Sequence, residues 1–187
     1  MNITKLLLAI AIASLCRLNA AKAQTNNPSP WRLGIGLETG ATTGFNDNKD
    51  LKIALGGTAR LQYSFNSKLA ATLTSGYYNF FLKNRHFYSP DGLFYSKTVG
   101  FNQGMVPVKL GLKYYLTGGF YAIGEAGAGF ETSVGKDTKL ILAPGLGYAK
   151  GHLDLGLRYE NFSDVTKSSY KNNYGLVGLR IAYGFGL

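Results

Sequence analysis

The last stretch of the chain, residues 174–187, alternates strictly between two kinds of side chain. The two sets are one apolar and one small or charged: Val177, Leu179, Ile181, Tyr183, Phe185 and Leu187 against Gly178, Arg180, Ala182, Gly184 and Gly186. A period of two predicts a β-strand with two different faces. Its length is about the ten residues that a tilted strand needs to cross the hydrocarbon layer of a bilayer.

Seven stretches upstream show the same alternation. We expect strands at 31–40, 51–65, 69–81, 106–116, 120–131, 139–149 and 152–162. The connections alternate between long loops and short turns, and the short turns lie at 66–68, 117–119 and 150–151. Outer-membrane barrels show this rhythm, because their periplasmic turns are short and their strand number is even. The sequence therefore predicts an all-β fold, an eight-stranded antiparallel transmembrane β-barrel with up-and-down meander order and both termini periplasmic.

Aromatic residues gather at both ends of the predicted strands. The set near the short turns and termini is Trp31, Tyr63, Phe65, Tyr114, Phe120, Tyr148, Tyr183 and Phe185. The set near the long loops is Tyr77, Tyr78, Phe80, Phe81, Tyr159, Phe162 and Tyr174. Membrane barrels carry aromatic girdles at both membrane surfaces, so we expect these two sets to be interfacial anchors.

Periodicity alone does not say which face points outward. A soluble lipocalin-like barrel would put the apolar set inside and the charges in water. Here the polar set mixes charge with glycine, which suits a narrow interior better than a water-facing surface. We therefore expect a side-chain-filled lumen containing Arg32, Lys52, Arg60, Lys109, Lys113, Arg158 and Arg180 with Glu38, Glu125, Asp154 and Glu160.

Residues 1–23 have the layout of a secretory signal peptide. Lys5 gives a positive start, residues 6–15 are almost entirely apolar, and Ala21 and Ala23 frame a small-residue cleavage site. The apolar run is shorter than the roughly 20 residues of a membrane-spanning helix. We therefore expect export through a cleaved leader, with the bacterial outer membrane as destination.

Removal of this leader changes the chemistry of the chain. Gln24 becomes the first residue, Cys16 is lost, and the formal net charge falls from +10 to +7. Disulfide and thiol chemistry are then excluded. We expect residues 24–30 to form an exposed lead-in and 31–187 the barrel, and we assign the basic excess to lipid phosphates or solvation rather than to nucleic acid.

Two segments carry a resemblance to a known family. Residues 106–130, with VPVKLGLKYYL followed by FYAIGEAGAGF, and residues 153–160, LDLGLRYE, resemble the porin-family outer-membrane β-barrel domain in its small eight-stranded form. The resemblance implies insertion by the barrel assembly machinery, which reads an alternating C-terminal strand that usually ends in an aromatic residue. This chain ends in Leu187 behind Tyr183 and Phe185, and these three residues form the expected assembly signal.

The residues offer little support for catalysis, a metal or a cofactor. His86 and His152 are the only histidines, and their spacing from serine and aspartate matches no catalytic triad. Distant histidines and no mature cysteine make no metal site. We therefore expect a protein that is not an enzyme, with a lipid A-modifying activity as a less favoured alternative.

The longest irregular segment, 83–105, combines basic and aromatic residues. The candidates for binding there are Lys83, Arg85, Phe87, Tyr88, Phe94, Tyr95 and Lys97. They could hold lipopolysaccharide phosphates or a protein partner, or simply cap the lumen. We expect a structural or interaction role, either in envelope stability or as an accessory subunit of an outer-membrane complex. The competing hypothesis is a narrow pore that weakly favours anions.

Overall fold

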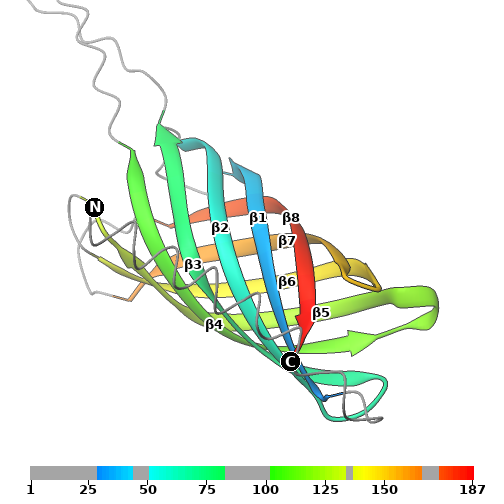
Figure 1. The fold of residues 1–187 in the computed structure, drawn as a ribbon. Helices are drawn as coiled ribbons and strands as arrows, with labels where there is room; N and C mark the ends of the chain where they lie inside the picture. Colours follow the sequence, from blue (N-terminus) through cyan, green and yellow to red (C-terminus); the bar gives the residue numbers. More distant parts are fainter. Residues whose placement is uncertain (1–28, 44–50, 83–101, 134–136, 166–172) are drawn as a thin grey trace, which may run out of the picture.

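The chain folds into a closed barrel of eight antiparallel strands (Figure 1). The computed structural model describes residues 29–43, 51–82, 102–133, 137–165 and 173–187. Each strand pairs with its neighbours in sequence, and β1 closes the sheet against β8. The strands are β1 Trp31–Thr43, β2 Leu51–Ser64, β3 Leu69–Leu82, β4 Gln103–Tyr115, β5 Phe120–Glu131, β6 Thr138–Lys150, β7 Leu153–Asp164 and β8 Tyr174–Gly186. The predicted eight-stranded meander is confirmed.

Several strands extend beyond their predicted ends at the long-loop end of the barrel. β1 continues to Thr43, and β4 begins at Gln103, so the last residues of the predicted loop 83–105 belong to a strand. Gln103 and Met105 pair with Phe80 and Tyr78 of β3 in the same register as the rest of the ladder. Residues 103–105 show no clear alternation of apolar and polar side chains, so the sequence did not predict them as a strand. Their strand conformation is stabilised by backbone pairing with β3. The predicted leader and most of the lead-in lie outside the described residues.

The short turns lie together at one end of the barrel, which we call the short-turn end. The turn between β4 and β5 is a 3-10 turn, η2 (Thr117–Gly119), in which Gly118 and Gly119 have positive φ angles of 72° and 92°. Gly151, with φ 58°, turns β6 into β7. Side chains with a Cβ rarely adopt these angles, so glycine is required there. In the turn before β3, the Asn66 side chain accepts hydrogen bonds from the Lys68 and Leu69 amides, both at 2.8 Å.

No helix in the part of the chain that the structure describes is long and apolar enough to span a membrane.

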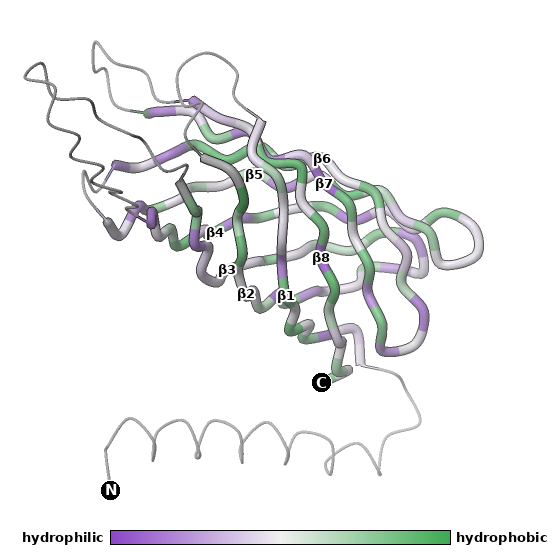
Figure 2. The backbone as a smooth tube through the Cα atoms, turned by 90° about the horizontal axis from the view of Figure 1, so that it is seen from above, coloured by the Kyte–Doolittle hydropathy of each residue, from purple (hydrophilic) through white to green (hydrophobic). Residues whose placement is uncertain are grey.

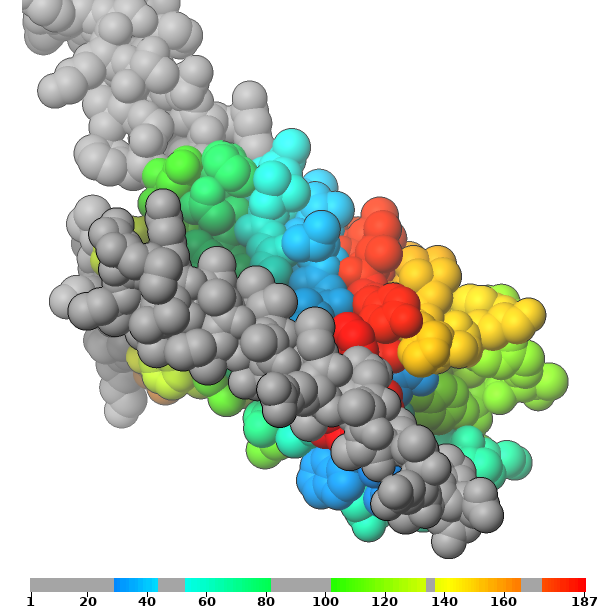
Figure 3. Space-filling model, viewed as in Figure 1, coloured from blue at the N-terminus to red at the C-terminus, as the bar shows by residue number. Residues whose placement is uncertain are grey.

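The outside of the barrel is apolar and the inside is polar. Hydrophobic and hydrophilic residues alternate along the strands (Figure 2), and the exposed large side chains are mostly leucine, isoleucine, valine and aromatic residues. Leu37 is 75% exposed and Leu110 66%, whereas Lys109 and Glu160 are fully buried. Figure 3 shows the outer surface where β1, in blue, meets β8, in red. Water-soluble proteins have the opposite distribution, so this is a membrane-spanning barrel.

Replacement of Leu179 by arginine tests the outward face. Leu179 lies midway along β8 and is 54% exposed, so the charge would face the centre of the hydrocarbon layer. We expect the free energy of unfolding in lipid vesicles to fall by about 2–4 kcal/mol. The matched control is Leu116→Arg, because Leu116 is 55% exposed but lies at the short-turn end. There the loss should be about 0–1 kcal/mol. Equal losses at both depths would contradict the membrane assignment.

Candidate functional site

Charged side chains fill the lumen. Glycine and alanine on the inward faces leave room for them to reach across the barrel, and each of the strands except β3 contributes at least one. The buried charged residues, which we call the lumen charge network, are Glu38, Arg60, Lys109, Lys113, Glu125, Glu131, Lys139, Asp154, Arg158, Glu160 and Arg180. Buried charges are stable only when they are paired and hydrogen-bonded, so their contacts decide whether the lumen is closed.

Glu160 of β7 is the centre of this network. Its Oε1 lies 2.6 Å from Lys109 Nζ and 2.5 Å from Arg158 Nε. Arg158 also pairs with Glu38 of β1. The hydroxyl of Tyr78 joins these groups: it accepts hydrogen bonds from Arg158 at 2.7 Å and Lys109 at 3.0 Å, and it donates to Glu160 at 3.2 Å. Four strands are therefore linked at one point inside the barrel.

Glu125 of β5 anchors a second cluster beside the first. Arg60 Nη2 donates to both of its oxygens at 3.1 Å, and the Thr74 hydroxyl donates at 2.6 Å. Arg60 Nε in turn donates to the Thr74 hydroxyl at 3.0 Å. Lys109 Nζ lies 3.9 Å from Glu125, so it connects this cluster to Glu160.

Asp154 organises the part of the network nearer the short-turn end. It pairs with Lys113 Nζ at 2.7 Å and accepts a hydrogen bond from the Tyr121 hydroxyl at 2.6 Å. The Lys113 ammonium lies 3.7 Å from the centre of the Tyr121 ring, a cation–π contact. Arg180 lies 3.9 Å from Asp154 and 3.3 Å from Glu38, and it links Asp154 to the central cluster.

A further group of charges lies near the long-loop end, and sequence reasoning missed it. Lys139 is fully buried, with Nζ 2.5 Å from Asp164 and 3.7 Å from Glu131. Glu131 and Glu125 are an even number of residues apart on β5, so strand phase places Glu131 inward as well. The alternation along β5 could therefore have predicted an inward Glu131. The prediction is easily missed because Glu131, Lys139 and Asp164 all lie near the ends of their strands, next to loops.

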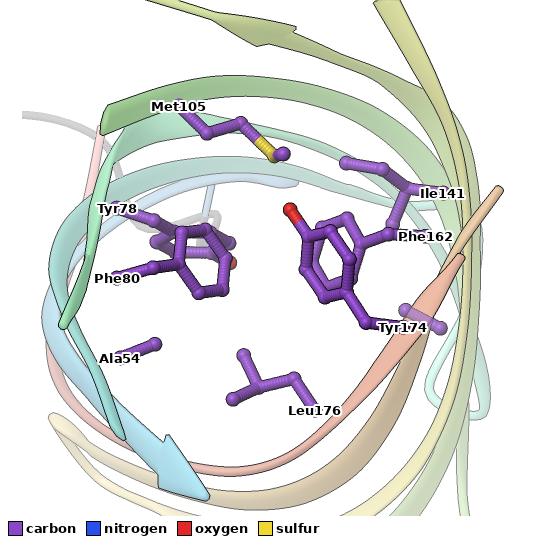
Figure 4. Packing of buried hydrophobic residues seen from close by; sticks show 9 residues of the cluster. Ala54, Tyr78, Phe80, Met105, Ile141, Phe162, Tyr174 and Leu176 are labelled. Atoms are coloured by element: carbon purple, nitrogen blue, oxygen red, sulfur yellow. The ribbon is translucent and has the colours of Figure 1, made fainter. Parts of the chain in front are cut away.

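An apolar layer separates the central cluster from Lys139. The rings of Phe80, Phe162 and Tyr174 lie 4.9–5.7 Å apart and contribute, with Met105 and Leu176, to a buried cluster (Figure 4). This corrects one sequence interpretation. Tyr78, Phe80, Phe162 and Tyr174 were expected in the aromatic girdle near the long loops, but each is at most 1% exposed and lies inside the barrel. Aromatic rings serve membrane interfaces and cores equally well, so residue type alone does not distinguish the two.

Comparisons with known proteins agree with this architecture. No protein-family model matches the chain, and no curated protein matches it in sequence. A solved structure of Ail, the attachment invasion locus protein of Yersinia pestis, is similar with a TM-score of 0.51 and 18% identity, covering 83% of this chain and 97% of Ail. Neisserial surface protein A gives a TM-score of 0.50 at 13% identity, covering 86% of this chain and 100% of its own. The chain has the small outer-membrane barrel fold.

Seven of the eight aromatic residues predicted for the short-turn end of this outer-membrane barrel pack against one another there in three separate groups. Among them Trp31 and Tyr63 have ring centres 4.8 Å apart, Phe120 and Tyr148 5.1 Å, and Tyr183 and Phe185 4.9 Å. The others contribute as well: Phe65 lies 5.3 Å from Tyr63, and Tyr114 is 47% exposed. Rings at this depth suit the boundary between hydrocarbon and headgroups.

Other predicted site residues lie apart from the network or outside the described residues. Arg32 is half-buried at the short-turn end, where it donates a 2.5 Å hydrogen bond to the Gly151 carbonyl. The Lys52 side chain and the binding candidates at 83–97 lie outside what the structure describes. The C-terminal signal residues Tyr183 and Phe185 lie on β8, and the Leu187 amide donates to the Trp31 carbonyl at 3.1 Å.

Of the two histidines, the structure describes His152. His152 is exposed at the short-turn end, with Nδ1 2.8 Å from the Gly184 carbonyl and its ring stacked on Tyr183 at 5.0 Å. His86 lies outside the described residues. Within the described ranges, no three or more histidine, cysteine, aspartate or glutamate side chains are grouped so that they could hold a metal ion.

Proposed function

We propose that this protein is a non-conducting, non-enzymatic barrel of the bacterial outer membrane. It serves as a rigid structural element that anchors its external loops and presents its outer surface to outer-membrane lipids and neighbouring membrane proteins. The observation that carries this proposal is the closed lumen. The centre of the lumen is filled by mutual contacts among Glu160, Tyr78, Lys109 and Arg158. The apolar layer around Phe80, which we call the Phe80 layer, fills the lumen next to them on the side of the long loops.

The charge balance favours this role over an anion-favouring pore. Seven positive and four negative inward residues were expected from the sequence, which would attract anions. The described residues instead place five buried carboxylates against six buried cations, and the carboxylate of Asp164 pairs with one of those cations, Lys139. Among the buried side chains that the structure describes, positive and negative charges therefore balance, so they give the lumen no net attraction for a free anion. Eight strands also enclose a space that side chains fill, which leaves little room for water.

Conductance across a planar bilayer tests the proposal. We expect the purified full-length protein to produce no steady single-channel steps in either polarity, because the ion pairs and the aromatic layer block the lumen. An outer-membrane porin inserted into the same bilayer is the positive control for detection. Insertion of the protein itself is checked by protease protection in vesicles made from the same lipid. Steady conductance steps that favour anions would support the pore hypothesis and contradict the proposal.

A further inference from the structure

An apolar groove lies on the lipid-facing side of strands β5 to β8, which are neighbours in the barrel (Figure 1). At the short-turn end it has a volume of about 590 Å³. The outward side chains that line it there are Leu116, Phe120, Leu146, Tyr148, Leu155, Leu157, Leu179 and Ile181. A second hollow shares Leu146 and Leu157 with the first, and a third, over β3 to β6, shares Pro144 with the second. The three hollows adjoin one another, and together we call them the outer groove.

Small residues of β5 form the floor of the outer groove. Ala122, Gly124 and Ala126 face outward between the larger side chains of β4 and β6, with which they pair. A Cβ at Gly124 would meet no atom within 4 Å, and Gly124 has no positive φ. Neither packing nor backbone conformation therefore requires glycine there, although glycine weakens a strand and often marks a close approach by a ligand. The space above Gly124 is open to a group from outside the barrel.

The outer groove has the depth of one membrane leaflet. Along β6 it runs from Tyr148, whose ring lies 5.1 Å from that of Phe120 at the short-turn end, to Leu142. This length of strand measures about 20 Å, and a tilt of about 40° reduces it to about 15 Å along the membrane normal. That is half of the roughly 30 Å hydrocarbon layer. The groove therefore matches the acyl chain of a lipid from one leaflet, whereas a membrane-spanning segment of a partner protein needs contacts over the full thickness.

Positive charge lies at the short-turn end of the outer groove. Lys150 is exposed at the end of β6, and Arg32 donates a hydrogen bond to the carbonyl of Gly151, the next residue in the turn. Among the residues that the structure describes, Asp154 is the one carboxylate side chain at this end, and it is buried and paired inside the lumen. An anionic phosphate at the level of the aromatic rings would therefore meet cations without a competing carboxylate beside it.

We propose that the outer groove binds one glycerophospholipid with an anionic headgroup, from the leaflet at the short-turn end. Its acyl chain lies along β5 and β6, and its phosphate lies beside Lys150. The proposal deepens the structural role above: it rests on the position of the barrel in the membrane but not on the closed lumen. A smooth wall contacts an acyl chain on one side, whereas the groove contacts it on its floor and along both flanks. This lipid therefore stays bound while the surrounding lipids exchange.

Native mass spectrometry of the full-length protein in detergent micelles, titrated with phosphatidylglycerol, tests this proposal. We expect one phosphatidylglycerol per barrel at concentrations at which zwitterionic phosphatidylcholine is not retained. Gly124→Leu fills the floor of the groove and should raise the apparent Kd about tenfold, the loss expected when about two CH₂ groups of the chain are displaced.

Gly57→Leu is the matched control for Gly124. Gly57 is also exposed in the middle of a strand, but it lies on β2, and it does not line any of the three hollows. A Cβ there would make only an ordinary contact of 3.9 Å with the Gly36 carbonyl. We expect this variant to bind phosphatidylglycerol as the wild type does.

Lys150→Gln provides an independent variant, and its result stands even if Gly124→Leu does not fold. It should raise the apparent Kd for phosphatidylglycerol about fivefold, as the loss of one cation at a membrane surface predicts. Its control is Lys68→Gln, because Lys68 is also exposed at the short-turn end but lies in the β2–β3 turn, four strands away around the closed barrel. This control should bind as the wild type does.

Several results would overturn the proposal. They are no retained lipid, equal retention of phosphatidylglycerol and phosphatidylcholine, or wild-type binding by Lys150→Gln or by folded Gly124→Leu. Dimers of the barrel that Gly124→Leu abolishes would also overturn it, because they would assign the outer groove to a second copy of the chain. Bilayer conductance is a separate measurement, so the closed-lumen function can fail or hold independently of this result.

Discussion

Replacement of Glu160 by glutamine is expected to lower the free energy of unfolding by about 3–5 kcal/mol. Glu160 is fully buried and holds both Lys109 and Arg158 at hydrogen-bonding distance. Glutamine keeps the size of the side chain but removes its charge, so two cations remain in the lumen without their shared partner. Fluorescence of the single tryptophan, Trp31, during urea unfolding in detergent micelles reports the change.

The double variant Glu160→Gln with Lys109→Met separates electrostatics from packing. It removes Lys109, one of the two cations that Glu160→Gln leaves without a carboxylate partner. We therefore expect its free energy of unfolding to fall less than that of Glu160→Gln alone. Residues that share an ion pair show such non-additivity, whereas independent sites do not. If the second substitution simply adds its own loss to the first, the coupling between Lys109 and Glu160 is absent and the central role of Glu160 is wrong.

Replacement of Phe80 by alanine is expected to cost about 3–5 kcal/mol. Its ring is fully buried and packs edge-on against Phe162 at 5.7 Å and Tyr174 at 5.5 Å. The smaller side chain would leave a cavity in the layer that separates Lys139 from the central cluster. The same urea titration measures the loss, with the slope of the transition as a check that the unfolded state is unchanged.

Phe130→Ala is the matched control for Phe80. Phe130 is 47% exposed on the outer face of β5, so lipid chains can fill the space that its ring leaves. Lipid tails are as apolar as leucine, and this loss should be clearly smaller. If the two variants are equally destabilised, the Phe80 layer does not act as a packed core.

The strand positions could be predicted because lipid and lumen impose opposite demands on alternate residues. Leu155 and Leu157 face outward, whereas Asp154 and Arg158 are buried, as the period of two requires. The pairing inside the lumen could not be predicted in the same way. Whether Lys109 meets Glu160 or Asp154 depends on the stagger between strands when the sheet closes, and no local pattern encodes that stagger.

The aromatic residues show a second limit. Phe120 and Phe80 are the same residue type near strand ends, yet one is 58% exposed and the other is fully buried. Strand phase separates them, because Phe80 shares its face with Thr72 and Thr74, which are also buried. Pro107 and Pro144 show the same limit: proline is visible in the sequence, but which residue pairs it interrupts depends on the register between neighbouring strands.

The charged lumen also restricts how the protein can enter the bilayer. A strand that crossed alone would expose a residue such as Lys109 or Arg180 to hydrocarbon, at a cost of about 2–4 kcal/mol for each cation near the midplane. Neighbouring strands must therefore enter together, already curled so that opposite charges face each other and keep their remaining water. Because the sheet is closed by the pairing of β1 with β8, these charges are enclosed on all sides only once that pairing has formed.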